Sequence, residues 1–156
     1  MNKKYKKITQ EQNSQLINKA AVLSSVRQPK QGWIKALRSA LSLSGAALSK
    51  RLGGHRSTVS YLERSEIEGS ITLKKMQQTA EAMGCRFVYG IVPPEGKTID
   101  DLINLRAEEV ASRIVEQTSI HMMLEGQQLS NNLQQKEVER LKAELLIQMP
   151  RNFWDD

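Results

Sequence analysis

Residues 44–64 of this chain read SGAALSKRLGGHRSTVSYLER. Ser44 is suited to cap the first turn of a short helix. That helix is predicted to run through Leu52 and to end at Gly53-Gly54, because glycine tolerates the positive φ that a helix C-terminus needs. A second helix follows the turn. Two short helices joined by a tight turn form the arrangement that places one helix in the major groove of DNA.

The two helices are expected to contact each other through Ala47 and Leu48 on the first and Val59 and Leu62 on the second. The residues between these apolar positions are polar or basic, so they are expected to face outward. Arginine bonds bidentately to guanine, and hydroxyl groups reach bases or phosphates. The candidate DNA-binding residues are therefore Ser44, Lys50, Arg51, His55, Arg56, Ser57, Thr58, Ser60, Tyr61 and Arg64.

Different roles are expected within this set. Arg56 is the candidate for reading a guanine, whereas Lys50, Arg51 and Arg64 would bind phosphates and fix the orientation. His55 has three open roles: it caps the second helix, touches a phosphate, or is an uninvolved surface histidine. The alternative for the whole stretch is a helical bundle in which the glycine turn is coincidental.

Further helices and one strand are predicted around this pair. Apolar residues recur at intervals of three and four over residues 33–41 and 73–83, as in amphipathic helices. Residues 86–92 read RFVYGIV, a β-branched and aromatic run that predicts a strand. A lone strand leaves its backbone N–H and C=O groups unpaired. We therefore expect a homodimer formed through strand 86–92.

Charge divides the chain unevenly. Residues 1–97 carry 17 Lys and Arg against 6 Asp and Glu, whereas residues 98–156 carry 6 against 11. A basic first part suits a polyanion such as double-stranded DNA, and an acidic second part suits a different partner. Charges that only solvate helix faces are the alternative. The predicted domains are a basic N-terminal arm and helix (1–31), a DNA-binding domain (32–96) and an acidic helical arm (97–156).

The acidic arm is predicted to hold two helices. Thr98 and Asp101 have the spacing of a capping box for the first, which would continue to about Leu124, and Ser130 is a candidate cap for the second. Glu125-Gly126 would present a carboxylate beside a turn, next to the apolar side chains of Met122, Met123 and Leu124. Such a terminus can bind an arginine in a pocket. Phe153 and Trp154 would either form exposed anchors for a partner or fold back onto the last helix.

The chain resembles the Xre/Cro-like repressor family at Leu48–Gly53 and at residues 59–63, which match the family's helix-turn-helix spacing. The resemblance covers about residues 32–92. It implies a mainly α-helical fold, with an Xre/Cro-like bundle, a short dimerisation strand and a helical arm, and it implies sequence-specific DNA binding. Many members carry a phosphate-contacting Gln where this chain has Gly45.

Residues 119–130 look like the inhibitory helix of antitoxins that block Fic-type adenylyltransferases. That motif is Ser or Thr, three residues, Glu, then Gly or Asn. Glu125 and Gly126 match it, and His121 stands in the hydroxyl position. By this resemblance Glu125 would pair with an arginine of the enzyme and prevent productive binding of ATP. The whole chain resembles the mobile mystery protein A family, repressor-like proteins encoded beside a Fic-domain protein.

Several other classes of protein are not expected. The enzyme's own motif is absent, and no constellation of catalytic, cofactor-binding or metal-ligating residues is present, since His55 and His121 are the only histidines. Cys85 is the single cysteine and is expected to be a buried structural thiol. No segment reads as a secretory signal or a membrane span, so we expect a cytoplasmic protein. The alternative function is a plain transcriptional regulator without enzyme-inhibiting activity.

Overall fold

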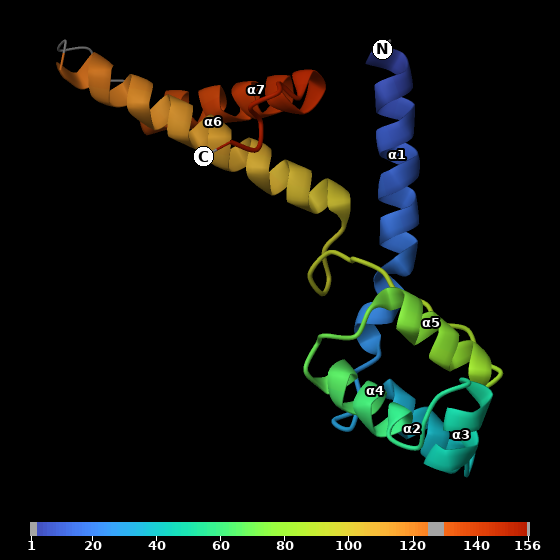
Figure 1. Cartoon of the computed structure of the whole chain (residues 1–156). Coiled ribbons are helices and arrows are strands. Elements are labelled where there is room, and N and C mark those ends of the chain that lie inside the picture. The colour runs from blue at the N-terminus through green and yellow to red at the C-terminus, as the bar shows by residue number, and fades with distance from the viewer. Residues whose placement is uncertain (1–2, 125–129, 156) are drawn as a thin grey trace. The chain divides into compact units, whose positions relative to one another are not determined.

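The computed structural model describes residues 3–124 and 130–155 (Figure 1). The chain forms two compact units, one made by Val22–Gly90 and the other by Met1–Ala21 with Ile91–Asp156. In the described residues all regular structure is helical, with one short 3-10 helix at Ala21–Ser25. The prediction of a mainly α-helical chain is therefore confirmed.

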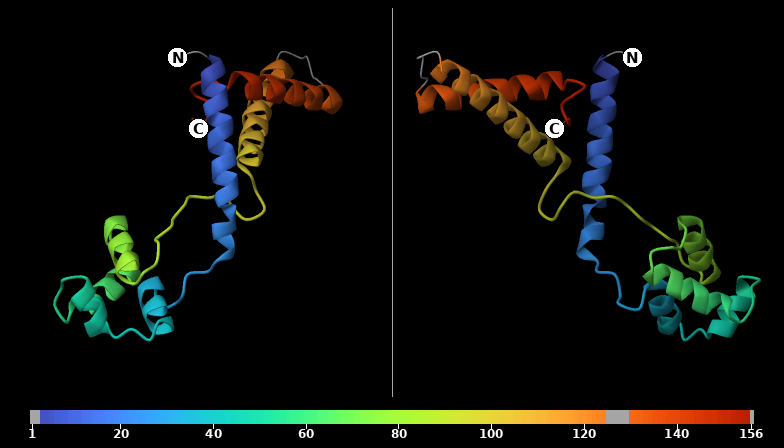
Figure 2. Two further views of the ribbon diagram at one scale, coloured as in Figure 1. Left: turned by 90° about the vertical axis from the view of Figure 1, so that its right-hand side faces the viewer. Right: turned by 60° about the vertical axis from the view of Figure 1, so that its left-hand side comes forward.

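The unit Val22–Gly90, called the four-helix unit below, contains α2 (Trp33–Ala40), α3 (Gly45–Arg51), α4 (Thr58–Ile67) and α5 (Leu73–Ala82). Figures 1 and 2 show these helices gathered into one cluster. Apolar side chains from all parts of the cluster meet in one core. Its buried members are Ile34, Leu48, Val59, Leu62 and Met83. The core orients α3 and α4 because each contributes its apolar side to it and leaves its polar side exposed.

Glu66 holds the start of α2 against α4. Gly32 precedes α2 and has no side chain that could cap it. The carboxylate of Glu66, which is buried, accepts hydrogen bonds from the backbone N–H groups of Trp33 at 2.6 Å and Ile34 at 2.9 Å. A Cβ atom at Gly32 would lie 2.8 Å from Glu66 Oε2, so glycine is required there for this close approach. A negative charge at a helix N-terminus is also favoured by the helix dipole.

A second polar contact connects α2, α4 and the turn before α3. Arg38 Nε lies 2.8 Å from Glu63 Oε1, and both side chains are mostly covered. Arg38 Nη1 also donates to the carbonyl oxygen of Leu43 at 3.2 Å. Because this guanidinium bonds to one carboxylate and one carbonyl, it fixes the path by which the chain enters α3.

The second unit contains α1 (Lys3–Ala20), α6 (Ile99–Leu124) and α7 (Asn131–Gln148), and is called the hairpin unit below. Helices α6 and α7 pack against each other and bury Ala107, Ala111 and Val115 of α6. The side-chain oxygen of Asn18 in α1 accepts a hydrogen bond from the N–H of Ile99 at 3.0 Å. The N-terminal helix therefore contacts the beginning of α6.

The chain end folds back onto α6. Phe153 is 2% exposed, whereas its neighbour Trp154 is 57% exposed. Arg106 of α6 donates through Nε to the carbonyl oxygen of Phe153 at 3.0 Å and through Nη2 to that of Asp155. Phe153 is therefore packed, although the hydrogen bonds of this chain end go to α6 and not to the last helix, and Trp154 is exposed, so that its role as an anchor for a partner stays a prediction.

Local sequence signals determine the starts of α6 and α7. Thr98 and Asp101 form the predicted capping box: the Asp101 N–H donates to Thr98 Oγ1 at 3.1 Å, and the Thr98 N–H donates to Asp101 Oδ2 at 2.7 Å. Ser130 Oγ accepts from the N–H of Leu133 at 3.4 Å. Both caps are confirmed, because each depends only on residues within one turn.

The capping box gives a pH prediction. The hydrogen bond from the Thr98 hydroxyl lowers the pKa of the Asp101 carboxyl below its usual value. Because the pKa of Asp101 is lower in the folded than in the unfolded protein, the capping box stabilises the folded protein fully at pH values above the unfolded-state pKa, roughly 4. This stabilisation is lost as the pH falls through the folded-state pKa of Asp101. We expect NMR titration of Thr98→Ala to show the Asp101 pKa raised toward its usual value, with Thr98→Ser unchanged. Identical Asp101 titrations in Thr98→Ala and wild type would contradict this account.

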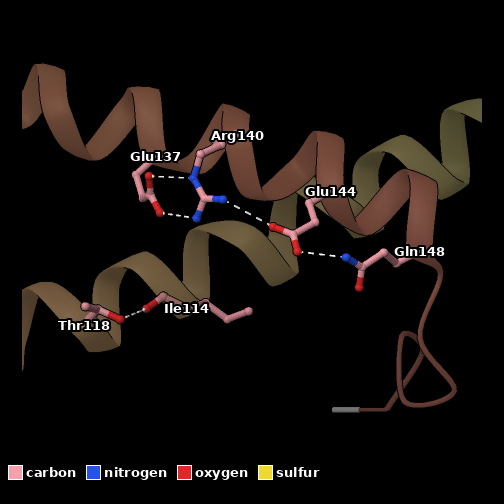
Figure 3. A network of polar contacts seen from close by, with 6 residues as sticks. All are labelled: Ile114, Thr118, Glu137, Arg140, Glu144 and Gln148. Atoms are coloured by element: carbon pink, nitrogen blue, oxygen red, sulfur yellow. Dashed lines mark hydrogen bonds and ion pairs between the residues drawn. The ribbon is translucent and has the colours of Figure 1, made fainter.

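The exposed side of α7 carries a local charge network (Figure 3). Arg140 donates to both carboxylate oxygens of Glu137, at 3.0 and 2.6 Å, and to Glu144 at 3.3 Å. Gln148 donates to the other oxygen of Glu144 at 2.8 Å. These pairs lie three and four residues apart on one helix and are solvated, so they support α7 only modestly.

Residues 86–92 differ in part from the prediction. The part of the chain that the structure describes contains no β-strand, and residues 86–92 form no backbone hydrogen bond within it. A strand needs a second strand for its ladder of hydrogen bonds, and the described residues supply none. The expectation for Cys85 is wrong: this thiol is exposed, because it follows the turn at Gly84 that ends the packing of α5.

None of the helices in the described residues combines the length and the apolar character needed to cross a membrane.

Candidate nucleic-acid interface

Helices α3 and α4 are held together by buried leucine and valine. Leu48 is 0% exposed, and Val59 and Leu62 of α4 are almost completely covered beside it. The predicted apolar contact is therefore confirmed for these three residues, and Ala47 is half-buried. This packing fixes which sides of α3 and α4 remain free for a ligand.

The turn between the two helices depends on both of its glycines. Gly53 has φ +65°, a conformation that glycine adopts readily. At Gly54 a Cβ atom would lie 2.6 Å from Thr58 Oγ1, so the absence of a side chain lets Thr58 approach the turn. The chain between the end of α3 at Arg51 and the start of α4 at Thr58 is therefore a short turn.

One side of α4 and its N-cap is polar and exposed. Ser57 lies three and four residues before Ser60 and Tyr61, and these two lie four and three residues before Arg64, so all four side chains lie along one helix face. Tyr61 is 69% exposed although it is aromatic. This strip of hydroxyl groups with a guanidinium is called the α4 polar face below. Hydroxyls and guanidinium groups are the donors and acceptors that read base edges and phosphates.

His55 and Arg56 lie in the turn before α4, and both are exposed. The sequence placed Arg56 on the helix, but α4 begins only at Thr58. The reason is local: the Thr58 N–H donates to the carbonyl oxygen of His55 at 2.9 Å, which forms a turn ahead of the helix. Arg56 therefore precedes the α4 polar face, at the helix end where unpaired backbone N–H groups favour anions.

Thr58 is the exception among the candidates on α4. It is half-buried against the turn at Gly54 rather than facing outward. Its side chain therefore packs the turn, and the structure does not place it among the exposed residues.

Helix α3 contributes a capping serine and two basic residues. Ser44 Oγ accepts from the Ala47 N–H at 3.1 Å, as predicted for an N-cap. Lys50 is exposed in the last turn of α3. Arg51 is exposed as well and donates through Nη1 to the carbonyl oxygen of Ala82 at 3.2 Å. These two cations and Arg64 bring positive charge to both helices of the pair.

The electrostatics of the four-helix unit favour an anionic ligand. Residues 22–90 contain eleven Lys and Arg against four Glu. Two of the four carboxylates are engaged internally, Glu63 with Arg38 and Glu66 with the start of α2. In the described residues no ion pair neutralises Lys50, Arg51, Arg56 or Arg64. An exposed basic surface of this kind attracts the phosphates of nucleic acid.

The candidate enzyme-inhibitory residues lie at the end of α6. His121 is exposed on α6, and Met122 is half-buried. Glu125 and Gly126 lie outside the described residues. Helix α6 extends through Leu124, as expected for the helix that precedes Glu125 in the sequence.

The polar residues that support the interface from within are not apparent from the sequence pattern. Glu66, Glu63 and Arg38 orient α2 and α4, although none of them faces a ligand. The available signal is Gly32, which precedes α2 and has no side chain that could cap this helix. The free N–H groups at the start of α2 must therefore bond to a residue elsewhere in the fold.

Comparison with protein-family models, with curated proteins and with solved structures gives no match for this chain.

Proposed function

We propose that the four-helix unit binds double-stranded DNA in a sequence-specific way and that the protein acts in the cytoplasm as a transcriptional repressor. The observation that carries this proposal is the α4 polar face next to the unneutralised Lys50, Arg51 and Arg56. An Xre/Cro-like helix-turn-helix requires such a face on its second helix. A helix face that only interacts with water would not need a large aromatic side chain, but Tyr61 is exposed on this face.

In this proposal α4 enters the major groove. Arg56 and the hydroxyl groups of the α4 polar face contact bases, and Lys50, Arg51 and Arg64 contact the flanking phosphates. A homodimer would present two such helices to an inverted repeat, with half-site centres about 34 Å apart. Repression follows because a bound dimer blocks access to the promoter that contains this site.

Two substitutions separate base reading from phosphate binding. Arg56→Ala is expected to reduce the preference for selected over scrambled DNA by about 1–3 kcal/mol, which is roughly 5- to 150-fold in the ratio of the two affinities. Its affinity for scrambled DNA should change little. Lys50→Ala is expected to weaken binding to all sequences alike. It should also reduce, by about one, the steepness with which the logarithm of the binding constant falls with the logarithm of the salt concentration. Fluorescence anisotropy with selected and scrambled duplexes at several salt concentrations measures both effects.

Arg27→Ala and Lys35→Ala are the matched controls, since both residues are exposed in the same unit but lie outside α3 and α4. Both should bind like wild type. An equal loss on selected and scrambled DNA for Arg56→Ala would rule out its role in reading a base.

A second function is supported by the sequence at the end of α6. We propose that the protein is also the antitoxin of a Fic-type adenylyltransferase encoded next to it, that it blocks productive ATP binding through Glu125, and that it represses its own operon. The support is the resemblance at Glu125 and Gly126, with His121 in the position where the motif has Ser or Thr, together with the 26-residue helix that precedes Glu125 in the sequence. A carboxylate forms strong, bidentate hydrogen bonds with an arginine, so Glu125 is suited to bind one inside another protein's pocket.

Transfer of AMP tests this second function. The neighbouring enzyme is incubated with labelled ATP and with wild type, with Glu125→Gly or with Glu116→Gln, a control at an exposed position of α6. Wild type and Glu116→Gln should silence the transfer, whereas Glu125→Gly should still bind the enzyme but leave it active. If the enzyme neither binds nor responds to the wild-type chain, the alternative of a plain transcriptional regulator holds.

A further inference from the structure

A cavity of about 460 Å³ lies in the four-helix unit where residues of α3, α4 and α5 come together. Figure 1 shows these three helices in one cluster. A cavity of this size is within the range of small-molecule sites. All of its lining residues belong to the four-helix unit, so one compact unit forms the whole site.

The covered lining residues form an uncharged floor. Leu62 is 5% exposed and Thr79 1%, and Leu52 and Ala82 are half-buried. The hydroxyl group of Thr79 is already used, because it donates to the carbonyl oxygen of Lys75 at 2.7 Å. The floor therefore offers mainly apolar contacts, which suit the hydrocarbon part of a ligand.

The exposed rim of the cavity is positively charged. Arg51 and Lys75 line it, and neither forms an ion pair in the described residues. Arg51 Nη1 donates to the carbonyl oxygen of Ala82 at 3.2 Å, which holds the guanidinium at the edge of the cavity and leaves its other N–H groups for a ligand. Glu81 is the one carboxylate among the described lining residues, and it accepts from Gln77 at 3.0 Å. Two cations against one carboxylate favour an anionic ligand.

Two more side chains bring hydrogen-bonding groups to the cavity. Thr58, the first residue of α4, is half-buried, and Gln78 of α5 is exposed. Neither side chain forms a hydrogen bond with another described residue. A hydroxyl and an amide can orient a ligand whose charged group is held by the rim.

We propose that this cavity binds a small organic carboxylate. The carboxylate group is held by Arg51 and Lys75, since the guanidinium fork matches the two carboxylate oxygens. The apolar body of the ligand contacts Leu52 and Leu62. A phosphate group of DNA would use the rim alone, because it brings no apolar body to the floor. The ligand is therefore a small molecule and not a segment of the nucleic acid.

Binding of this ligand opposes DNA binding, a consequence that rests on the function proposed above. Arg51 is also one of the proposed phosphate contacts, and one guanidinium cannot serve a carboxylate and a phosphate fully at the same time. By linkage, the ligand lowers the affinity for DNA by the same factor by which DNA lowers the affinity for the ligand. The carboxylate thus acts as an inducer that releases the repressor.

Titration of the isotope-labelled full chain with benzoate, followed by NMR, tests the site. Benzoate carries one carboxylate on an apolar ring. The amide signals of Thr79 and Ala82 are expected to shift and to saturate, whereas those of α7 should not move. Benzamide has the same ring without the charge and should bind about tenfold more weakly, because charge-assisted hydrogen bonds are lost. Inorganic phosphate has charge but no ring and should also bind more weakly than benzoate.

A matched pair of lysines on α5 separates the cavity from general positive charge. Lys75→Gln should weaken benzoate binding about three- to fivefold, which is the effect of one exposed charge pair. Lys74→Gln should bind benzoate like wild type, since Lys74 is exposed on the same helix but does not line the cavity. Equal affinities of the two variants, equal affinities for benzoate and benzamide, tighter binding of phosphate, or shifts that never saturate would overturn the proposal.

Fluorescence anisotropy with the selected duplex tests the coupling to DNA. Benzoate should weaken DNA binding more than sodium chloride does at the same concentration, and Lys75→Gln should need about three- to fivefold more benzoate for the same effect. If benzoate fills the cavity but acts on DNA binding only as sodium chloride does, the competition for Arg51 is overturned. A chain that selects no DNA sequence would overturn the proposed DNA binding alone, because the NMR titration contains no DNA and still decides the cavity.

Discussion

Leu48→Ala is expected to destabilise the four-helix unit by about 2–5 kcal/mol. Leu48 is completely buried between α3 and α4, so its truncation removes apolar contacts and leaves a cavity in the core. The four-helix unit is small, and a loss of this size should lower its Tm by roughly 10 °C or more. DNA binding should fall in parallel, because the relative orientation of α3 and α4 depends on this contact.

The two tryptophans allow this prediction to be measured in one unit. Trp33 lies in the four-helix unit and Trp154 in the hairpin unit. In a Trp154→Phe background, thermal unfolding followed by Trp33 fluorescence reports on the four-helix unit. Leu41→Ala is the matched control, since Leu41 is 48% exposed. Equal shifts for Leu48→Ala and Leu41→Ala would contradict the packing described for α3 and α4.

Phe153→Ala should have an effect of similar size on the hairpin unit, about 3–5 kcal/mol. Phe153 is almost fully buried, and its ring meets that of Trp154 edge to face with centroids 5.2 Å apart. Its carbonyl oxygen also accepts from Arg106. Loss of the ring should release the chain end and expose the covered side of α6.

Hydrogen exchange of α6 peptides measures this effect directly, because amide protection reports on local and global opening of the helix. Phe153→Ala should exchange far faster than wild type. Trp154→Ala, with a side chain that is 57% exposed, should cost less than about 1 kcal/mol and change exchange little. Protection that is unchanged in Phe153→Ala would show that the chain end does not stabilise α6.

The features that sequence predicts well here depend on residues within one helical turn. The caps at Ser44 and Ser130 and the box of Thr98 with Asp101 were predicted correctly for this reason. The turn at Gly53 is similarly local, because the requirement for a positive φ limits the choice of residue.

The features that sequence analysis missed connect distant residues. Glu66 caps a helix that begins 33 positions earlier, and Arg106 bonds to Phe153, 47 positions later. Helical periodicity does not identify such pairs, since a buried glutamate on α4 looks like any polar residue of that helix. Residues 86–92 illustrate a different limit: their composition predicts a strand, but residues 3–124 and 130–155 contain no second strand that could pair with it.

The candidate site was predicted in composition but not in detail. The basic and hydroxyl residues lie on α3, α4 and the turn, as expected, and most of them are exposed. The start of α4 is the main difference, because it moves Arg56 into the turn and leaves Thr58 half-buried. A shift of one or two residues at a helix start is enough to change which side chains a groove would meet.

Selection from a pool of random duplex DNA tests the central claim most directly. The full-length protein is used to recover bound duplexes over several rounds, and the recovered DNA is sequenced, with Arg56→Ala processed in parallel. Wild type is expected to enrich an inverted repeat with half-site centres about one helical turn apart, and Arg56→Ala is expected to relax the preference at one position in each half-site. Recovery of DNA with no enriched sequence, equal to a pool processed without protein, would contradict it.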